Sequence, residues 1–212
     1  MVKLGLFPLN LVLFPEAIYP LHIFEDRYKK LINTSIDNGE EFGINLVTSS
    51  KMYDFGCTAK VHQVTKRYAD GKIDLNVIGV RRYSLIGFSE HEMPYYTGEI
   101  EFFSDRDELL DEPGLIDVIN LFNELASTIK LVNIKRLKLE DLETKYPSFF
   151  IAQKSGLSPI QKQELLEMKS ENNRLSFLRR HLKNILPALN EAQQIEKVVQ
   201  NDGYLSPNQF NS

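Results

Sequence analysis

The side chains best suited to metal binding or proton transfer are the histidines, and the sequence spreads them apart. The chain has four of them: His22, His62, His91 and His181. None has an HxxxH or HExxH partner, the spacing that brings two imidazoles onto one helix face. His91 is soon followed by Met93-Pro94, and a proline cannot continue a metal-binding helix. The sequence therefore predicts no metal site.

Three of these histidines have simpler structural interpretations. We expect His22 to lie in a strand with its ring bonded to a backbone carbonyl. We expect His62 to mark a bulge in a strand, and His181, which follows Arg179-Arg180, to lie on a solvated helix face. Cys57 is the only cysteine, which excludes an intramolecular disulfide and fits a small apolar residue in a strand.

Adjacent carboxylates occur repeatedly, but sequence neighbours do not by themselves make an acid–base pair. The pairs include Glu25-Asp26, Glu40-Glu41 and Asp111-Glu112. General acid–base catalysis needs two carboxyls in different environments within one cleft. We expect Glu25 and Asp26 to open a helix instead, because the helix dipole favours negative charge at that end.

Sequence motifs for nucleotide binding and for nucleophilic catalysis are missing as well. The 212 residues contain no GxxxxGK[ST], no GxGxxG and no GxSxG. We therefore predict a non-catalytic protein without a bound cofactor. A hydrolase of unrecognised type is an alternative, and it requires a pocket in which titratable side chains converge.

Charge and hydropathy are those of an ordinary soluble globular protein. Hydrophobic residues make up 42% of the chain and charged residues 25%, and the net charge is −4. Residues 1–104 hold 11 Lys and Arg against 13 Asp and Glu, and residues 105–212 hold 14 against 16, so neither half is built to neutralise phosphates. The longest uncharged apolar stretch, residues 4–15, is too short to span a bilayer and does not have the pattern of a signal peptide. These features predict a cytoplasmic protein with no membrane partner.

Hydrophobic spacing predicts the elements that position these residues, and the first half of the chain is rich in strands. Pro8, Pro15 and Pro20 interrupt the apolar N-terminal run, which argues against a continuous helix or a central strand there. Residues 24–32 are apolar at positions 24, 28, 31 and 32, the period of a short amphipathic helix. Alternating patterns predict strands at 42–47, 57–61, 73–77 and 97–103.

Asp70-Gly71 predicts a tight hairpin between two of these strands. If these two residues form the loop, Arg67 faces Asp74 on the outer face of the sheet. Apolar residues change from odd to even positions along the first arm, which predicts a bulge near His62-Gln63. Such a bulge indicates a sheet that curls as in small barrels.

The spacing in the second half is that of helices. Residues 115–129 and 175–189 each carry an apolar helical stripe, and a short helix is expected around 149–152. Ser158 and Gln161 fit a capping box, and Pro187 is expected to kink or divide the last helix. The sequence thus predicts a β-rich part, a helical part and a polar tail, over residues 1–104, 105–200 and 201–212 respectively.

Several segments resemble the Lon protease N-terminal, or substrate-binding, domain family. The family pattern "LPLFPLxxVLFPGxxxPLxIFExRYxxLI" is matched over most of residues 6–32, and Glu16 stands where the family often has Gly. Further similarities stand at Gly56-Cys57-Thr58-Ala59, at residues 77–83 and at residues 157–175. The resemblance covers roughly residues 4–186.

The resemblance implies an α+β fold, with an N-terminal PUA-like β pseudo-barrel carrying one short helix, followed by a C-terminal α-helical bundle. Full-length Lon proteases join this domain to an ATPase and a Ser-Lys peptidase, and this chain ends before either could begin. The resemblance therefore implies a non-catalytic module that binds unfolded or damaged polypeptide, for example as an adaptor in protein quality control. Neither the sequence nor the resemblance identifies the contact residues, the oligomeric state or the pathway.

PUA-like barrels include RNA binders, so an RNA-binding protein is the alternative. Lys66-Arg67 and Arg81-Arg82, with Tyr68 and Tyr83 nearby, could offer a surface for phosphates and stacked bases. The acidic balance of this half argues against nucleic acid, and the expected ion pair with Asp74 would remove one cation.

Six aromatic side chains gather near the ends and connections of the predicted strands: Tyr53, Phe55, Tyr95, Tyr96, Phe102 and Phe103. Most of them are expected in the core. Any that are exposed beside an open strand edge would suit the binding of an extended polypeptide by strand addition.

Overall fold

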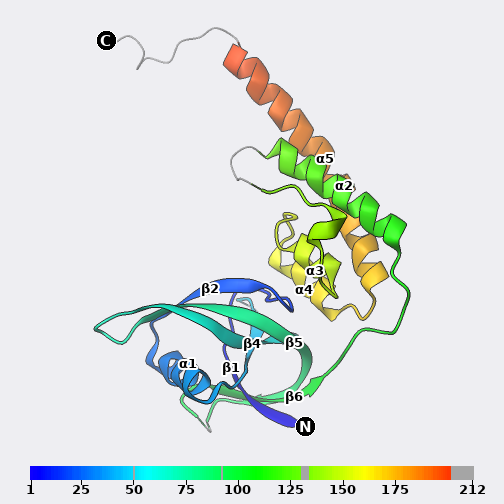
Figure 1. Cartoon of the computed structure of the whole chain (residues 1–212). Helices are drawn as coiled ribbons and strands as arrows, with labels where there is room; N and C mark the ends of the chain where they lie inside the picture. The colour runs from blue at the N-terminus through cyan, green and yellow to red at the C-terminus, as the bar shows by residue number, and fades with distance from the viewer. Residues whose placement is uncertain (50, 92, 130–133, 202–212) are drawn as a thin grey trace, which may run out of the picture.

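Strands dominate the first half of the chain and helices the second (Figure 1). The structure is a computed structural model that describes residues 1–49, 51–91, 93–129 and 134–201, without the side chains of residues 193 and 196–201. The strands are β1 (Val2–Leu6), β2 (Ile18–Ile23), β3 (Phe42–Val47), β4 (Met52–Arg67), β5 (Ile73–Ser89) and β6 (Tyr96–Phe102). The helices are α1 (Asp26–Asn38), α2 (Glu112–Thr128), the 3-10 helix η1 (Leu139–Asp141), α3 (Pro147–Ala152), α4 (Pro159–Glu167) and α5 (Glu171–Asn201).

The six strands form one sheet that curls into a ring. Their order is β2-β5-β4-β3-β1-β6, and an additional pairing between β5 and β6 closes the ring. β5 can serve both neighbours because it is 17 residues long: residues 73–78 pair with β2, and residues 83–89 pair with β6. The predicted α+β fold, a pseudo-barrel with one short helix followed by helices, is confirmed.

Irregular pairing along β4 and β5 lets these long strands bend. The register shifts in three places, and one of them lies between Val61 and Gln63, which confirms the bulge predicted near His62. The predicted pairing of Arg67 with Asp74 is wrong, because Arg67 pairs with Ile73.

The cause of this register error is the hairpin loop. Tyr68 N–H donates to Lys72 O (2.9 Å) and Gly71 N–H donates to Tyr68 O (3.0 Å), so the loop has three residues instead of two. Gly71 adopts φ +81°, the left-handed residue with which such loops end. The additional loop residue moves the pairing by one position, and Lys66 faces Asp74.

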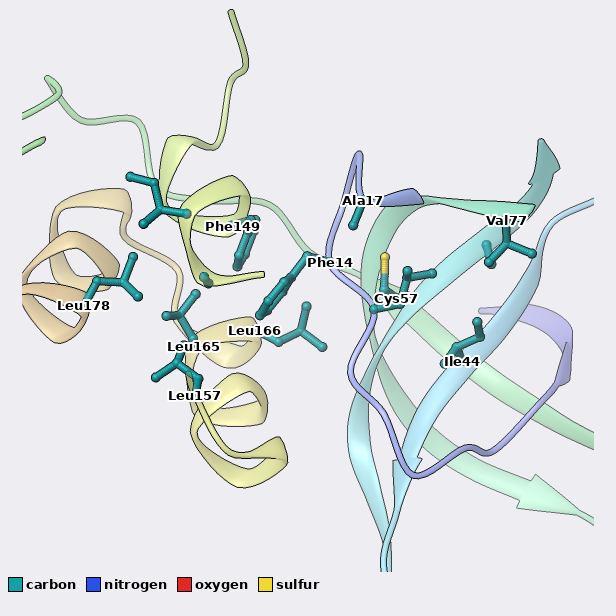
Figure 2. Packing of buried hydrophobic residues seen from close by; sticks show 14 of the residues in the cluster. Phe14, Ala17, Ile44, Cys57, Val77, Phe149, Leu157, Leu165, Leu166 and Leu178 are labelled. Atoms are coloured by element: carbon teal, nitrogen blue, oxygen red, sulfur yellow. The ribbon is translucent and has the colours of Figure 1, made fainter. Parts of the chain in front are cut away.

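The N-terminal segment between β1 and β2 runs between the barrel and the helices. Phe14 from this segment stacks on Phe149 of α3, with ring centroids 4.9 Å apart, and joins the two halves in one apolar core (Figure 2). Glu16 has φ +64°, the left-handed conformation that favours the glycine of the family pattern. Pro20 lies in β2 at the edge of the sheet, where a missing N–H is tolerated.

Most predicted helical features are confirmed, with two differences. α1 starts at Asp26, so Phe24 precedes the helix and is 58% exposed instead of joining its buried stripe. Ser158 and Gln161 form the predicted capping box of α4. α5 continues through Pro187, so the helix is not divided there, and the kink given as the alternative stays a prediction. Asn201 belongs to α5, and the rest of the predicted tail lies outside the described residues.

Candidate functional site

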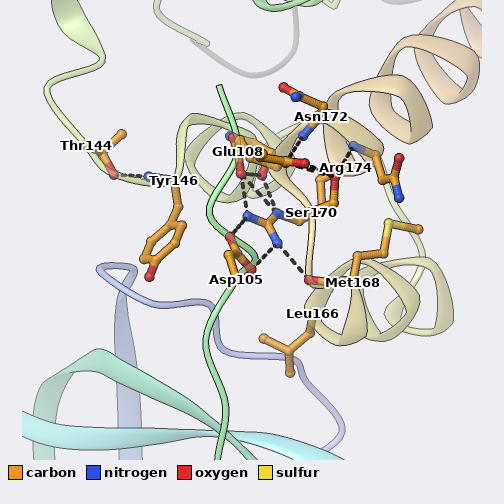
Figure 3. Close-up of polar contacts among 12 residues, drawn as sticks. Asp105, Glu108, Thr144, Tyr146, Leu166, Met168, Ser170, Asn172 and Arg174 are labelled. Carbon is orange, nitrogen blue, oxygen red and sulfur yellow. Dashed lines mark hydrogen bonds and ion pairs between the residues drawn. The ribbon is translucent and has the colours of Figure 1, made fainter. Parts of the chain in front are cut away.

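A buried cluster of charged side chains, which we call the junction cluster, lies where the barrel meets the helices and consists of Arg82, Asp105, Glu171 and Arg174 (Figure 3). Asp105, on the connection between β6 and α2, forms ion pairs with Arg82 of β5 and Arg174 of α5. Arg174 also pairs with Glu171 (2.5 Å), and Glu171 accepts the hydroxyl hydrogen bond of Ser148 in α3 (2.8 Å). The cluster therefore ties one strand, one connection and two helices together.

Both arginines in this cluster also donate to backbone carbonyls at the end of α4. Arg82 Nη1 reaches Leu166 O (2.9 Å) and Met168 O (2.6 Å), and Arg174 Nη1 reaches Met168 O (2.7 Å). These carbonyls belong to the last turn of the helix and the residue after it, where acceptors lack intrahelical partners. Each guanidinium thus meets both a carboxylate and main-chain acceptors.

The protonation states in the cluster follow from these contacts. Burial alone would raise the pKa of the Asp105 carboxyl, but the hydrogen bonds and charges of Arg174 and Arg82 outweigh it and lower the pKa below its usual value. Burial alone would lower the pKa of Arg174, and the bonds and charges of Asp105 and Glu171 raise it instead. Asp105 is therefore an ionised anchor, which is unsuited to donating a proton near neutral pH.

A cleft of about 330 Å³ opens beside this cluster, and it is the candidate active site under the hydrolase alternative. Its lining includes Asp105, Glu108 and Glu171. Glu108 accepts hydrogen bonds from the backbone N–H of Asn172 and from the Ser170 hydroxyl, which lower the pKa of its carboxyl. Asp105, Glu108 and Glu171 are thus held by structural partners, and the fourth carboxylate of the lining, Asp107, is exposed to solvent. Among the residues that the structure describes, no group of three His, Cys, Asp or Glu side chains could hold a metal ion.

Only part of the basic surface considered for RNA is exposed: Lys66 and Arg67 face solvent and Lys66 lies over the ring of Tyr68 (4.4 Å), but the second pair of basic residues does not join them. Arg82 is buried in the junction cluster, and Tyr83 is buried and donates to Asn45. Arg81 forms an ion pair with Glu41 (3.1 Å) and lies over the ring of Phe102. The chain alternates sides along β5, so the neighbouring arginines 81 and 82 point in opposite directions.

Two histidine predictions are wrong for the same reason: partners distant in sequence. His22 Nδ1 contacts the carboxylate of Asp74 (2.5 Å), not a backbone carbonyl. His181 is buried instead of solvated, with Nε2 2.9 Å from Ser155 O and Nδ1 3.3 Å from Gln161 Nε2. Cys57 is buried as expected, and burial raises the pKa of its thiol to about 12.

A groove with a mixed apolar and polar lining lies at the end of the barrel beside the start of β6, and we call it the barrel-end groove. Its volume is about 550 Å³, and it is lined by Pro8, Val47, Thr48, Ser49, Lys51, Met52, Phe88, Glu90 and Tyr96. Phe88 and Tyr96 meet edge to face, with ring centroids 5.9 Å apart. Phe88 is 50% exposed, and its strand neighbour Ile86 is 54% exposed.

Large apolar side chains with this exposure are the usual mark of an interaction surface when they occur together. Of the six aromatic residues singled out in the sequence, Tyr95 is buried and the other five are half-buried, so the expectation that most lie in the core is not met. Tyr96 belongs to the barrel-end groove, whereas Phe88 was not among the six. The only local signal for Phe88 is the preceding Gly87, where an added Cβ would meet nothing within 4 Å.

Comparisons with known proteins agree on one family. The profile of the "ATP-dependent protease La (LON) substrate-binding domain" matches residues 3–184. The Lon N-terminal domain protein of Xanthomonas campestris superposes with a TM-score of 0.67 over 84% of this chain and 97% of its own, at 23% identity. The N-terminal domain of the Mycobacterium avium complex Lon protease gives 0.64 over 86% and 98%, at 19% identity.

Full-length relatives match the same part of the chain. The Lon protease of Dictyoglomus thermophilum is 25% identical over 203 residues, which are 90% of this chain and 25% of that protein. Lon protease 1 of Hydrogenovibrio crunogenus is 25% identical over 207 residues, 90% of this chain and 24% of its own. The fold is thus that of Lon N-terminal domains, a barrel joined to helices. The chain belongs to the Lon substrate-binding domain family, and it spans about a quarter of the length of these curated relatives.

The helices of the structure bear on membrane association. Within the described ranges, no helix is both long enough and apolar enough to cross a bilayer.

Proposed function

We propose that this protein binds unfolded or partly folded polypeptide without chemical action of its own, and that it serves as an adaptor in protein quality control. The observation that carries the proposal is the barrel-end groove, a hollow of about 550 Å³ in which the half-exposed ring of Phe88 meets that of Tyr96. Unfolded chains expose apolar side chains, which such a surface would cover. Family membership supports the same role, because the matched family is described as a substrate-binding domain.

The arrangement of the two halves is part of this proposal. We treat residues 1–104 as the binding barrel and residues 105–200 as a helical support. The last strand ends at Phe102 and α2 begins at Glu112, so the proposed boundary falls in the connection between them. Asp105 in this connection is held by the junction cluster, which would keep the barrel fixed while polypeptide is bound.

Fluorescence anisotropy with a labelled, permanently unfolded probe tests the proposal. Reduced and carboxymethylated lactalbumin is a suitable probe because it cannot refold. Binding should be nearly independent of salt, since it depends on apolar contact instead of charge. Phe88→Ser should weaken binding by about fivefold or more, as expected when an aromatic anchor is lost.

The matched control is Ile116→Ser, which removes an apolar side chain of similar exposure (45%) from α2. This variant should bind the probe as the wild type does. No binding of the probe by the folded wild-type protein would refute the proposal. A steep fall of affinity for labelled RNA with salt, together with no affinity for the probe, would favour the nucleic-acid alternative.

A further inference from the structure

β2 lies at the edge of the sheet. The strand pairs with β5 on one side, and the ring of the barrel closes through β5 and β6 without it. Among the residues that the structure describes, no strand pairs with the other edge of β2. Figure 1 shows β2 at the side of the barrel nearest the helices, outside the closed ring. An edge of this kind is a template for a further strand.

The pairing with β5 determines which main-chain groups lie on the uncovered edge. Gly79 N–H donates to Ala17 O (2.9 Å), just before β2, and the pairing continues in register with Tyr19 opposite Val77. Hydrogen-bonded positions alternate along an antiparallel pair, so the main-chain groups of residues 19, 21 and 23 point to β5. Those of Ile18, Pro20 and His22 therefore point outward.

The side chains around this edge are unusually apolar for an exposed strand. Ile18 is 52% exposed, Tyr19 is 42% exposed, and Phe24 just beyond the strand is 58% exposed. Exposed edges normally carry charged residues that discourage pairing. In β2 the one residue that discourages pairing is Pro20, which removes one of the three outward N–H groups and leaves all three outward carbonyls available.

Pro20 also argues against a second copy of this chain as the strand that pairs with the outer edge of β2. In the fullest antiparallel overlap of two β2 edges, Ile18 would face His22 of the other copy, and Pro20 would face Pro20. That central pair would have two carbonyls and no donor, so the two bonds expected there could not form. A strand from a different polypeptide meets only one proline and keeps its own donor opposite Pro20 O.

We propose that the outer edge of β2 binds an extended, apolar segment of a polypeptide by strand addition. This inference rests on the proposed polypeptide-binding function and adds a second contact for the bound polypeptide, because β2 pairs with residues 73–78 of β5 whereas Phe88 of the barrel-end groove lies near the other end of that strand. Main-chain bonds at Ile18 and His22 give binding that does not depend on sequence, while Ile18, Tyr19 and Phe24 select apolar side chains. Such recognition suits unfolded chains, because every sequence offers the same backbone.

The test compares His22→Pro with His22→Ala against the labelled, carboxymethylated lactalbumin. Both variants lose the contact with Asp74, but only the proline removes the outward N–H, and it breaks no bond to β5. His22→Pro should bind about three- to tenfold more weakly than His22→Ala, the effect of one main-chain hydrogen bond and a blocked edge. Equal affinities of the two variants would overturn the inference.

Hydrogen exchange of the wild-type protein, followed by NMR, gives a readout that does not depend on the folding of a variant. Saturation with the probe should slow exchange of the Ile18 and His22 amides at least about tenfold, while Tyr19 and Leu21 are already slow in the free protein. Unchanged exchange at Ile18 and His22 in a bound complex would overturn strand addition and leave the proposed function intact. Failure of the wild-type protein to bind the probe would refute both.

Discussion

Removing the charge of Asp105 is the sharpest test of how the two halves are held together. Asp105 lies between two buried guanidinium groups, and its carboxylate is the counter-charge that Arg82 shares with Arg174. Asp105→Asn keeps the size of the side chain but leaves Arg82 without a carboxylate partner. Arg174 keeps Glu171 (2.5 Å). The loss of unfolding free energy in this variant therefore measures how much one unpaired buried cation destabilises the fold.

The magnitude follows from the burial of the partners. Breaking a buried ion pair by removing one partner costs about 3–5 kcal/mol, because the remaining charge stays desolvated. For a domain of this size each kcal/mol corresponds to roughly 2–4 °C, so the melting temperature should fall by roughly 6–20 °C. Urea denaturation and calorimetry measure the two quantities. Asp107→Asn, two residues along at an exposed position, is the control and should change stability by less than about 0.5 kcal/mol.

The pH dependence provides a second check on the same residue. The folded pKa of Asp105 is lowered, so its contribution is present above the unfolded pKa of about 3.9 and is lost as the pH falls through the folded value. The stability difference between wild type and Asp105→Asn should therefore be constant near neutral pH and should narrow below about pH 5. A loss under about 1 kcal/mol at pH 7, or a difference that does not change with pH, would refute the reasoning.

Three further predictions concern single positions of the barrel. Gly79→Ala places a Cβ 2.0 Å from Phe14 O and should lower the free energy of unfolding, measured by urea denaturation, by about 1–3 kcal/mol. Gly87→Ala on the same strand is the control, because its Cβ meets nothing within 4 Å, and equal losses in the two variants would contradict the packing. At Glu16, with φ +64°, a glycine should be at least as stable as the wild type, while Glu16→Val should lose about 1 kcal/mol or more by thermal melting; a stable valine variant would argue against this backbone conformation. Cys57, buried and with its pKa raised to about 12, should react with a thiol reagent at pH 8 only after unfolding, and rapid labelling of the native protein would disprove its burial.

Local sequence patterns predict the structure correctly where the deciding contacts are close in sequence. The capping box of Ser158 and Gln161 spans one helical turn, and the bulge near His62 follows from a change of parity within one strand. The predicted pairing register of the hairpin is wrong because Asp70-Gly71 is compatible with more than one loop length. Only the geometry of the neighbouring strands selects the three-residue loop over the two-residue one.

Residues whose partners lie far along the chain could not be placed from their neighbours. His181 follows two arginines, which suggests a solvated face, yet its ring is buried against Ser155 O. Arg82 is next to the exposed Arg81 in the sequence, but its partner Asp105 lies 23 positions later. Asp105 in turn pairs with Arg174, which lies another 69 positions later. No pattern within a window of one element carries such information.

The sequence by itself determined the kind of elements and their order, because hydrophobic period, capping and turn chemistry act over a few residues, and the resemblance of its motifs indicated the family. The tertiary structure alone decided which charges are buried and which apolar side chains stay outside. Phe88 and Phe149 are both phenylalanines in regular elements, yet Phe149 is sealed by Phe14 and Phe88 is half exposed beside a groove. Burial depends on what another part of the chain brings to the same place, and that is settled only when barrel and helices pack together.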